Sequence, residues 1–103
     1  MPKMLVWAMS GYELVQGKFD PCGDHAGKWE TSMLMHLDPG MQDLSALSGD
    51  KGVKPVGASN NGMRESSSEF GARATEAIVS VVRGRVEELL KNREKYQGHG
   101  SPM

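Results

Sequence analysis

A single long amphipathic helix near the C-terminus is the feature that most limits how this chain can fold. Through residues 70–90, apolar side chains recur at steps of three and four residues, which places them in one stripe along an α-helix. Charged side chains fill the other face of the same segment. Ser66 and Glu69 have the spacing of a capping box, in which each side chain satisfies a free backbone amide at a helix start. The pattern predicts a helix over about 67–95.

This helix is too long for the chain to cover by itself. At 1.5 Å per residue it would extend for roughly 40 Å, whereas a compact domain of about 100 residues has a radius of gyration of only about 13 Å. Part of the helix and part of its apolar stripe are therefore expected to extend beyond whatever the rest of the chain builds around them.

Residues 4–9 form a continuous apolar run, which is typical of a strand buried on both faces, as in a parallel sheet covered by helices. This run predicts an α/β fold. A buried strand needs neighbours for its amides and carbonyls, yet the one further candidate is a short extended piece at 53–56. We therefore expect the chain to be incomplete alone, and to self-associate or bind a partner through its apolar helix stripe and unpaired strand.

Turn-forming residues divide the rest of the sequence. Residues 17–27 hold a proline and three glycines and are predicted to form a loop. A short helix is predicted over 29–37, ended by an Asp-Pro-Gly turn. Glycine, proline and asparagine recur through 42–63, which predicts further turns. The chain is thus predicted to be one partial domain, 1–97, followed by a polar tail, 98–103.

The composition argues against several classes of partner. The formal net charge is -1 and the isoelectric point is about 6.3, so the overall charge favours neither nucleic acid nor an anionic membrane as a partner. No apolar run approaches the ~18 residues needed to span a bilayer. The single cysteine, Cys22, excludes an internal disulfide and agrees with a reducing compartment, so we expect a cytoplasmic protein.

Residues 23–32 combine features that catalytic sites use. His25 lies in a loop of small residues directly before the predicted helix, where free amides and a partial positive charge are available. An imidazole there can act near an oxyanion or a substrate carbonyl, and Gly27 permits close backbone approach. His25 and Glu30 converge only if His25 precedes the helix, because helical residues five apart diverge by about 140°. The alternative is a histidine that only hydrogen-bonds the loop.

Two segments of the chain resemble motifs of the creatininase family. The sequence H-A-G-K-W-E-T-S at 25–32 is similar to the family's H-A-G-x-x-E-T-S motif. The segment 57–71 is similar to the family's G-V-x-G-D-P-x-x-A-S-A-E-x-G sequence, which a long closing helix follows. The resemblance covers about 5–90. It implies that the chain is the C-terminal part of a three-layer α/β/α fold, with one or two strands, a short helix and a long C-terminal helix.

The resemblance also implies an activity. Members of this family hydrolyse C–N bonds of cyclic amides, formamides or peptides, and many assemble as homo-hexamers. Their centre of two divalent metal ions (zinc, manganese or iron) activates the attacking water. By the match to the motif, His25 would carry protons and Glu30 would be the second catalytic residue. Asp24, Gly27 and Cys22 are assigned to the substrate side of the same loop.

The same resemblance implies that part of the site comes from elsewhere. The family's metal ligands lie in an E-x-H-G-x-H-L-P-x-x-x-D segment and a G-H-G-G-N-like segment, and neither precedes Met4. We therefore expect the chain alone to hold no metal ion and to have no hydrolase activity. The aromatic–acid pair that creatininase itself places before the histidine is replaced by Pro21 and Cys22, which argues against creatinine as the substrate.

Two classes of function remain open. In the first, the chain is a fragment or subunit of a creatininase-like amidohydrolase that acts on a small molecule, completed by a homo-oligomer or by a missing N-terminal half. In the second, it is a truncated, non-catalytic remnant that serves as an oligomerising or binding module. A partner chain that carries the metal-ligand segments, or an in-frame region upstream of Met1 that encodes them, would favour the first class.

Overall fold

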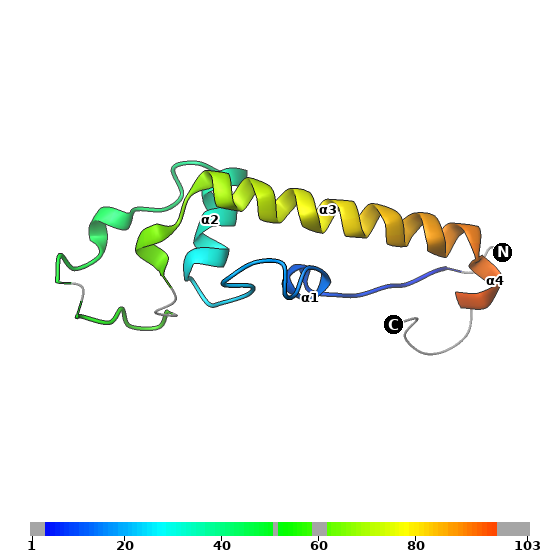
Figure 1. Ribbon diagram of the computed structural model, residues 1–103, viewed down its shortest axis with the longest axis horizontal. Helices are drawn as coiled ribbons and strands as arrows, with labels where there is room; N and C mark the ends of the chain where they lie inside the picture. The colour runs from blue at the N-terminus through cyan, green and yellow to red at the C-terminus, as the bar shows by residue number, and fades with distance from the viewer. Residues whose placement is uncertain (1–3, 51, 59–61, 97–103) are drawn as a thin grey trace.

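Helix α3, Ser68–Lys91, runs along most of the length of the molecule (Figure 1). The computed structural model describes residues 4–50, 52–58 and 62–96. The molecule measures 58 × 26 × 22 Å, and its radius of gyration is 17.6 Å, well above the about 13 Å of a compact domain of this size. The molecule is therefore elongated, in agreement with a helix longer than a compact domain of this size.

The other helices are short. They are α1 (Gly11–Leu14), α2 (Lys28–Leu37) and α4 (Arg93–Tyr96). Two short 3-10 helices, Leu44–Ala46 and Met63–Glu65, lie in the long connection between α2 and α3. Figure 1 shows α2 across the N-terminal end of α3, and both α1 and α2 pack against α3. The helix predicted over 29–37 and the loop predicted over 17–27 are confirmed.

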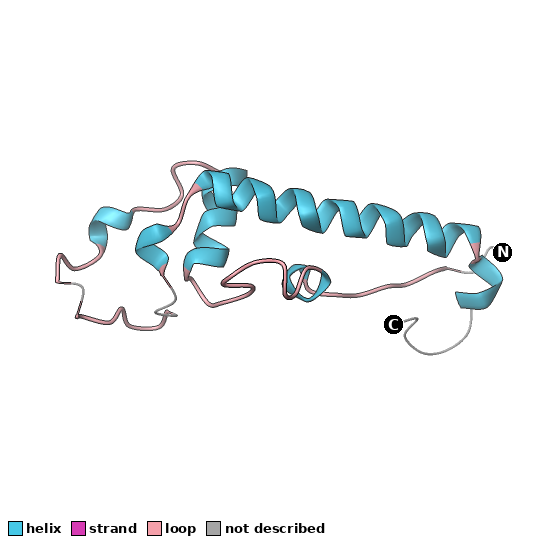
Figure 2. Ribbon diagram, viewed as in Figure 1, coloured by secondary structure: helices cyan, strands magenta, loops and turns pink. Residues whose placement is uncertain are grey.

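The predicted α/β fold is wrong. Within the described residues there are helices and loops but no strand (Figure 2), so no sheet and no three-layer α/β/α arrangement forms there. The segment 4–9 is extended, and Leu5, Trp7 and Met9 are half-buried while the residues between them are exposed. A strand exists only as a member of a hydrogen-bonded ladder. No described segment pairs its backbone with 4–9, and the second candidate, 53–56, is irregular loop.

Helix α1 is absent from the elements predicted above, although its start carries a recognisable signal. The amide and the hydroxyl of Ser10 donate to the Glu13 carboxylate, at 3.2 and 2.7 Å. These bonds, led by the one from the hydroxyl, hold the pKa of Glu13 below its usual 4.5. The S-x-x-E spacing at 10–13 is that of a capping box. The apolar run before it favoured the interpretation that a strand ends here.

The start of α3 differs by one residue from the prediction. Ser67 is the N-cap, and its hydroxyl accepts from the Phe70 amide at 3.1 Å. The Ser66 hydroxyl instead donates to the Met63 carbonyl at 2.6 Å. Ser67 is selected because its own amide is already bound, at 3.0 Å, by the hydroxyl of Ser32 on α2. The predicted pairing of Ser66 with Glu69 is therefore wrong.

Helices α2 and α3 touch through backbone where they cross. Ser32 has no exposed surface. A Cβ added at Gly71 would overlap the carbonyl oxygen of Ser32, so only glycine lets α3 approach α2 this closely. The Ser32 hydroxyl thus accepts a hydrogen bond from the amide of Ser67, just before α3, while its carbonyl oxygen contacts Gly71 in the first turns of the same helix. These two contacts fix how the helices cross.

Three aromatic rings fill the core beside this crossing. Trp29 and Phe70 are buried, and Phe19 packs edge-on against both, with ring centroids 5.6 Å from Trp29 and 5.7 Å from Phe70. Val15 and Ala74 complete the buried cluster with no exposed surface. Edge-to-face contacts of this kind stabilise by about 0.5–1.5 kcal/mol beyond the area they bury. The core therefore sits at one end of α3, and the remaining length of α3 is covered less fully.

The C-terminal end of α3 is tied to α4 through Glu88. The Tyr96 hydroxyl donates to the Glu88 carboxylate, and the Arg85 guanidinium forms an ion pair with it. These contacts, with the Tyr96 hydrogen bond the largest, lower the pKa of Glu88 below its usual 4.5. Helix α3 ends at Lys91, four residues before the predicted end, because Asn92 leaves the helical path. The predicted tail, 98–103, lies outside the described residues.

None of the helices in the described ranges has a sufficiently long apolar stretch to traverse a bilayer.

We predict that Gly71→Ala lowers the free energy of unfolding by about 1–3 kcal/mol, the usual range for forcing atoms into a packed site. The matched control is Gly84→Ala in the same helix, where a Cβ would meet open space. That change should stabilise by about 0.5–1 kcal/mol because alanine is the better helix former. Urea unfolding followed by circular dichroism measures both, and equal effects would contradict the close crossing.

We also predict that Tyr96→Phe raises the pKa of Glu88 toward 4.5. A carboxyl whose folded pKa is depressed stabilises the fold above its unfolded pKa, and this stabilisation is lost as the pH falls through the lower, folded value. The variant should therefore lose less stability than the native chain on acidification. Carboxyl-carbon NMR titration reports the pKa directly. Tyr12→Phe is the control, and an unchanged Glu88 titration in Tyr96→Phe would contradict the contact.

Candidate functional site

The loop that carries the predicted site is held against α1. Gly23 has a positive φ of 84°, and a Cβ there would lie 2.8 Å from the ring of Tyr12, so glycine is required by both backbone and space. The neighbouring Cys22 thiol donates to the carbonyls of Tyr12 and Val15, at 3.3 and 3.6 Å. Cys22 also packs on the hydrophobic core. In the described structure this side chain fastens the loop to α1.

Asp24 closes the N-terminus of α2. Its two carboxylate oxygens accept from three backbone amides, those of Gly27 at 3.2 Å, Trp29 at 2.7 Å and Glu30 at 3.0 Å. The first amides of a helix have no partner within the helix and carry a partial positive charge, so a carboxylate is well matched to them. Gly27, the N-cap residue, is itself buried beneath this contact.

Glu30 holds the strained residue of the loop. Ala26 has a positive φ of 53°, which is uncommon for a residue with a Cβ. Its amide donates to the Glu30 carboxylate at 2.7 Å, and its carbonyl accepts from the Thr31 hydroxyl at 3.3 Å. The side chains of α2 therefore reach back and stabilise the conformation that turns the chain into the helix.

His25 lies next to this carboxylate and is open to solvent. Its Nδ1 is 4.0 Å from the Glu30 Oε2, and 78% of its side chain is exposed. The predicted convergence of His25 and Glu30 is thus present, with His25 before the helix as required. An exposed imidazole beside a carboxylate can accept and release a proton, and the carboxylate favours an orientation in which Nδ1 faces it.

A shallow apolar groove of about 400 Å³ begins at Glu30. It runs between α1, α2 and α3, and its lining side chains include Tyr12, Trp29, Met33, Leu34, Leu37 and Ile78. A second hollow of about 590 Å³ is lined by residues of 46–48, 53–56 and 62–65, and none of the predicted site residues lines it. His25 lines neither hollow, so the described residues do not enclose its ring.

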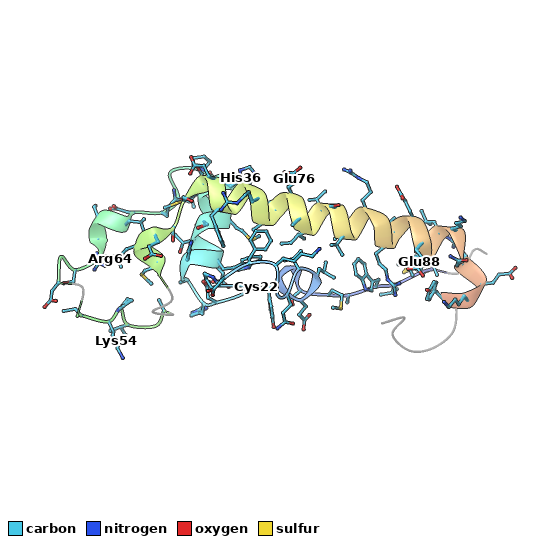
Figure 3. The ribbon with its side chains drawn as sticks, in the orientation of Figure 1. Cys22, His36, Lys54, Arg64, Glu76 and Glu88 are labelled. Carbon is cyan, nitrogen blue, oxygen red and sulfur yellow. The ribbon has the colours of Figure 1, made fainter. Side chains whose placement is uncertain are left out.

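The described residues do not fit a two-metal centre. No group of three or more histidine, cysteine or acidic side chains among them is placed to hold a metal ion. Asp24 and Glu30, the acids of the same motif as His25, accept hydrogen bonds from backbone amides. His36 is exposed in the last turn of α2, at the opposite end of that helix from the loop that carries Cys22 (Figure 3). The third histidine, His99, lies outside the described ranges.

The two segments that resemble the creatininase family meet in space. Ser32 belongs to the first and Ser67 and Gly71 to the second, and they form the crossing of α2 and α3. Sequence reasoning missed this contact, although Ser32 and Gly71 both lie inside the quoted motifs. A buried serine that caps a distant helix has no local sequence signal, because its partner lies 35 residues away.

Comparison of the sequence with protein-family models and with curated proteins, and of the structure with solved structures, found no match. These comparisons therefore give no support to the resemblance to the creatininase family, which stays a prediction from the two motifs.

We predict that Asp24→Ala destabilises the fold by about 1–2 kcal/mol, the upper range for loss of a helix cap, because three amides lose their acceptor. The control is Asp38→Ala at the other end of α2, where the acidic residue is exposed and faces the negative end of the helix dipole. That change should be neutral or slightly stabilising. Thermal unfolding compares the two, and an Asp24→Ala variant as stable as Asp38→Ala would remove the capping role.

Proposed function

We propose that this chain contributes a proton-transfer side chain, His25, to the active site of a creatininase-like hydrolase of C–N bonds whose metal ligands come from a complementary polypeptide. The observation that carries the proposal is the position of His25 directly before α2, within 4.0 Å of Glu30. The contact of the two family-like segments at Ser32 and Gly71 supports it, since it gives both motifs a shared place in one structure.

The roles follow from the contacts. With Nδ1 toward Glu30, the Nε2 atom of His25 is directed away from that carboxylate and can take a proton from a nucleophile and return it to a leaving nitrogen. Glu30 is a positioning residue, because the same carboxylate oxygen also binds the Ala26 amide and fixes the loop. Asp24 acts through the helix start that it caps. Divalent metal ions belong to the complementary polypeptide in this proposal, since the described donors do not fit them.

The extended segment 4–9 is the surface on which such a polypeptide would dock. Its backbone groups have no ladder partner in the described structure, and its outward side chains, Met4 and Val6, are 82% and 71% exposed. A strand from another chain can pair with an edge of this kind and cover its apolar outer side. We also propose that the protein acts in the cytoplasm, since a single cysteine agrees with a reducing compartment.

A non-catalytic binding module is the second candidate. It is favoured by one observation: the carboxylates of Asp24 and Glu30 both accept hydrogen bonds from backbone amides. Each residue therefore has a structural role in the loop that needs no catalytic one. In that case the loop is a structural helix start, and the exposed apolar surfaces are the functional part of the chain.

The test is complementation with a polypeptide that carries the two metal-ligand segments of a creatininase-family enzyme. We predict that the chain alone neither holds two metal ions nor hydrolyses a cyclic amide, whereas the zinc- or manganese-loaded complex hydrolyses it. His25→Ala in the complex should lower turnover by about 10² to 10⁴, the usual loss for a positioned acid–base group. His36→Ala, an exposed histidine at the far end of α2, is the control.

Two outcomes would contradict the catalytic role. Unchanged turnover in His25→Ala would remove that residue from the chemistry. A stable complex that binds metal but hydrolyses nothing would favour the binding module. Two ions bound by the chain alone, with hydrolysis, would mean that the site is built from this sequence after all.

A further inference from the structure

The apolar face of helix α3 is wider than the part of it that packs on the core. The buried stripe, which includes Phe70, Ala74 and Val81, packs on the core. At one edge of that face, Val79, Val86 and Leu90 are 46%, 42% and 55% exposed. At 100° per residue these three lie within about 40° of one another around the helix, and about 60–100° from the buried Leu89. The described chain covers the rest of the apolar face, so this exposed edge is left for a second partner to cover.

The exposed edge, together with the half-buried residues next to it, has the spacing of a coiled-coil seam. Exposed Val79, Val86 and Leu90 and half-buried Thr75 and Val82 form the outer stripe, and steps of four, three, four and four residues separate the five along the sequence. Steps of three and four are those of the a and d positions along a heptad seam, which pack against the same positions of a second helix. β-branched residues occupy four of the five positions, so the side chains are similar in shape along the stripe. Two copies of the stripe can therefore pack against each other.

The charges beside the outer stripe point to a second copy in an antiparallel arrangement. If Val79 faces Val82 of the partner subunit, then Glu76 lies beside Arg83 of the partner subunit, and the two-fold axis repeats this pair. Glu76 and Arg83 are exposed, with no partner in the described chain, and Glu76 projects from α3 away from α1 (Figure 3). A parallel arrangement would bring no acid beside a base along this seam. Opposite charges at such flanking positions select partner and orientation.

We propose that two copies of this chain pair through the outer stripe of α3, antiparallel, with reciprocal Glu76–Arg83 ion pairs. Such an interface is isologous, since each copy presents the same surface to the other. It involves residues of α3 alone and none of the loop before α2, so it leaves His25 and its loop accessible. The pairing goes beyond the hydrolase proposal and does not depend on it.

Sedimentation of the full chain over a range of concentrations tests the pairing. We expect a species of twice the 11.2 kDa chain mass. Glu76→Arg and Arg83→Glu should each raise the dissociation constant about tenfold or more, because like charges then meet twice across the seam. The double variant Glu76→Arg/Arg83→Glu should restore dimerisation, since the pairs are reversed and not removed. This restoration distinguishes a specific pairing from general apolar association.

The controls use the same helix. Lys91→Glu changes the charge as Arg83→Glu does but lies about 120° around the helix from Val79, so dimerisation should persist. Val79→Glu should abolish it while circular dichroism retains the helix signal, because the site is exposed and no core contact is lost. A monomer at all concentrations would overturn the proposal. So would a dimer that neither charge variant weakens, which would place the interface elsewhere, for instance on 4–9.

Discussion

The backbone contact between Gly71 and Ser32 determines how closely α2 approaches α3, and the site loop takes its position from that approach. Because Gly71 has no Cβ, the carbonyl of Ser32 sits directly against α3. The Ser32 hydroxyl then binds the Ser67 amide and selects the first turn of α3. With the two helices held at this distance, the rings of Trp29 and Phe70 meet in the core, and the start of α2 faces outward with its loop.

The loop motif performs a structural task that is complete in itself. Asp24 satisfies the free amides of α2, and Glu30 and Thr31 hold the left-handed Ala26 that turns the chain into the helix. Helix-start chemistry therefore explains the acidic residues and the threonine of the motif without any substrate. His25 is the exception. Its exposed ring takes no part in these hydrogen bonds, and its Nδ1 lies 4.0 Å from the Glu30 carboxylate. A chemical role for the motif accordingly rests on His25 and on what a partner brings to it.

The unusual shape of the molecule follows from the amount of apolar surface relative to chain length. One long helix with a wide apolar face needs covering elements along its whole length, and the described chain places its core at one end of α3. Two different surfaces stay open. The segment 4–9 offers unpaired backbone and suits a strand, whereas the outer side of α3 offers side chains flanked by Glu76 and Arg83 and suits a helix. One surface would bind through backbone hydrogen bonds and the other through apolar and charged side chains, so different partners suit them.

The sequence by itself determined the elements whose causes are local. The helices over 28–37 and 68–91 were predictable because apolar periodicity and helix-stopping turns act over three or four residues. Helix geometry also required His25 to lie before the helix if it was to approach Glu30. Only the tertiary structure decided whether 4–9 becomes a strand, because a strand depends on a neighbour that can lie anywhere in the sequence. It also decided the cap of α3, since the hydroxyl that selects Ser67 comes from α2, 35 residues earlier.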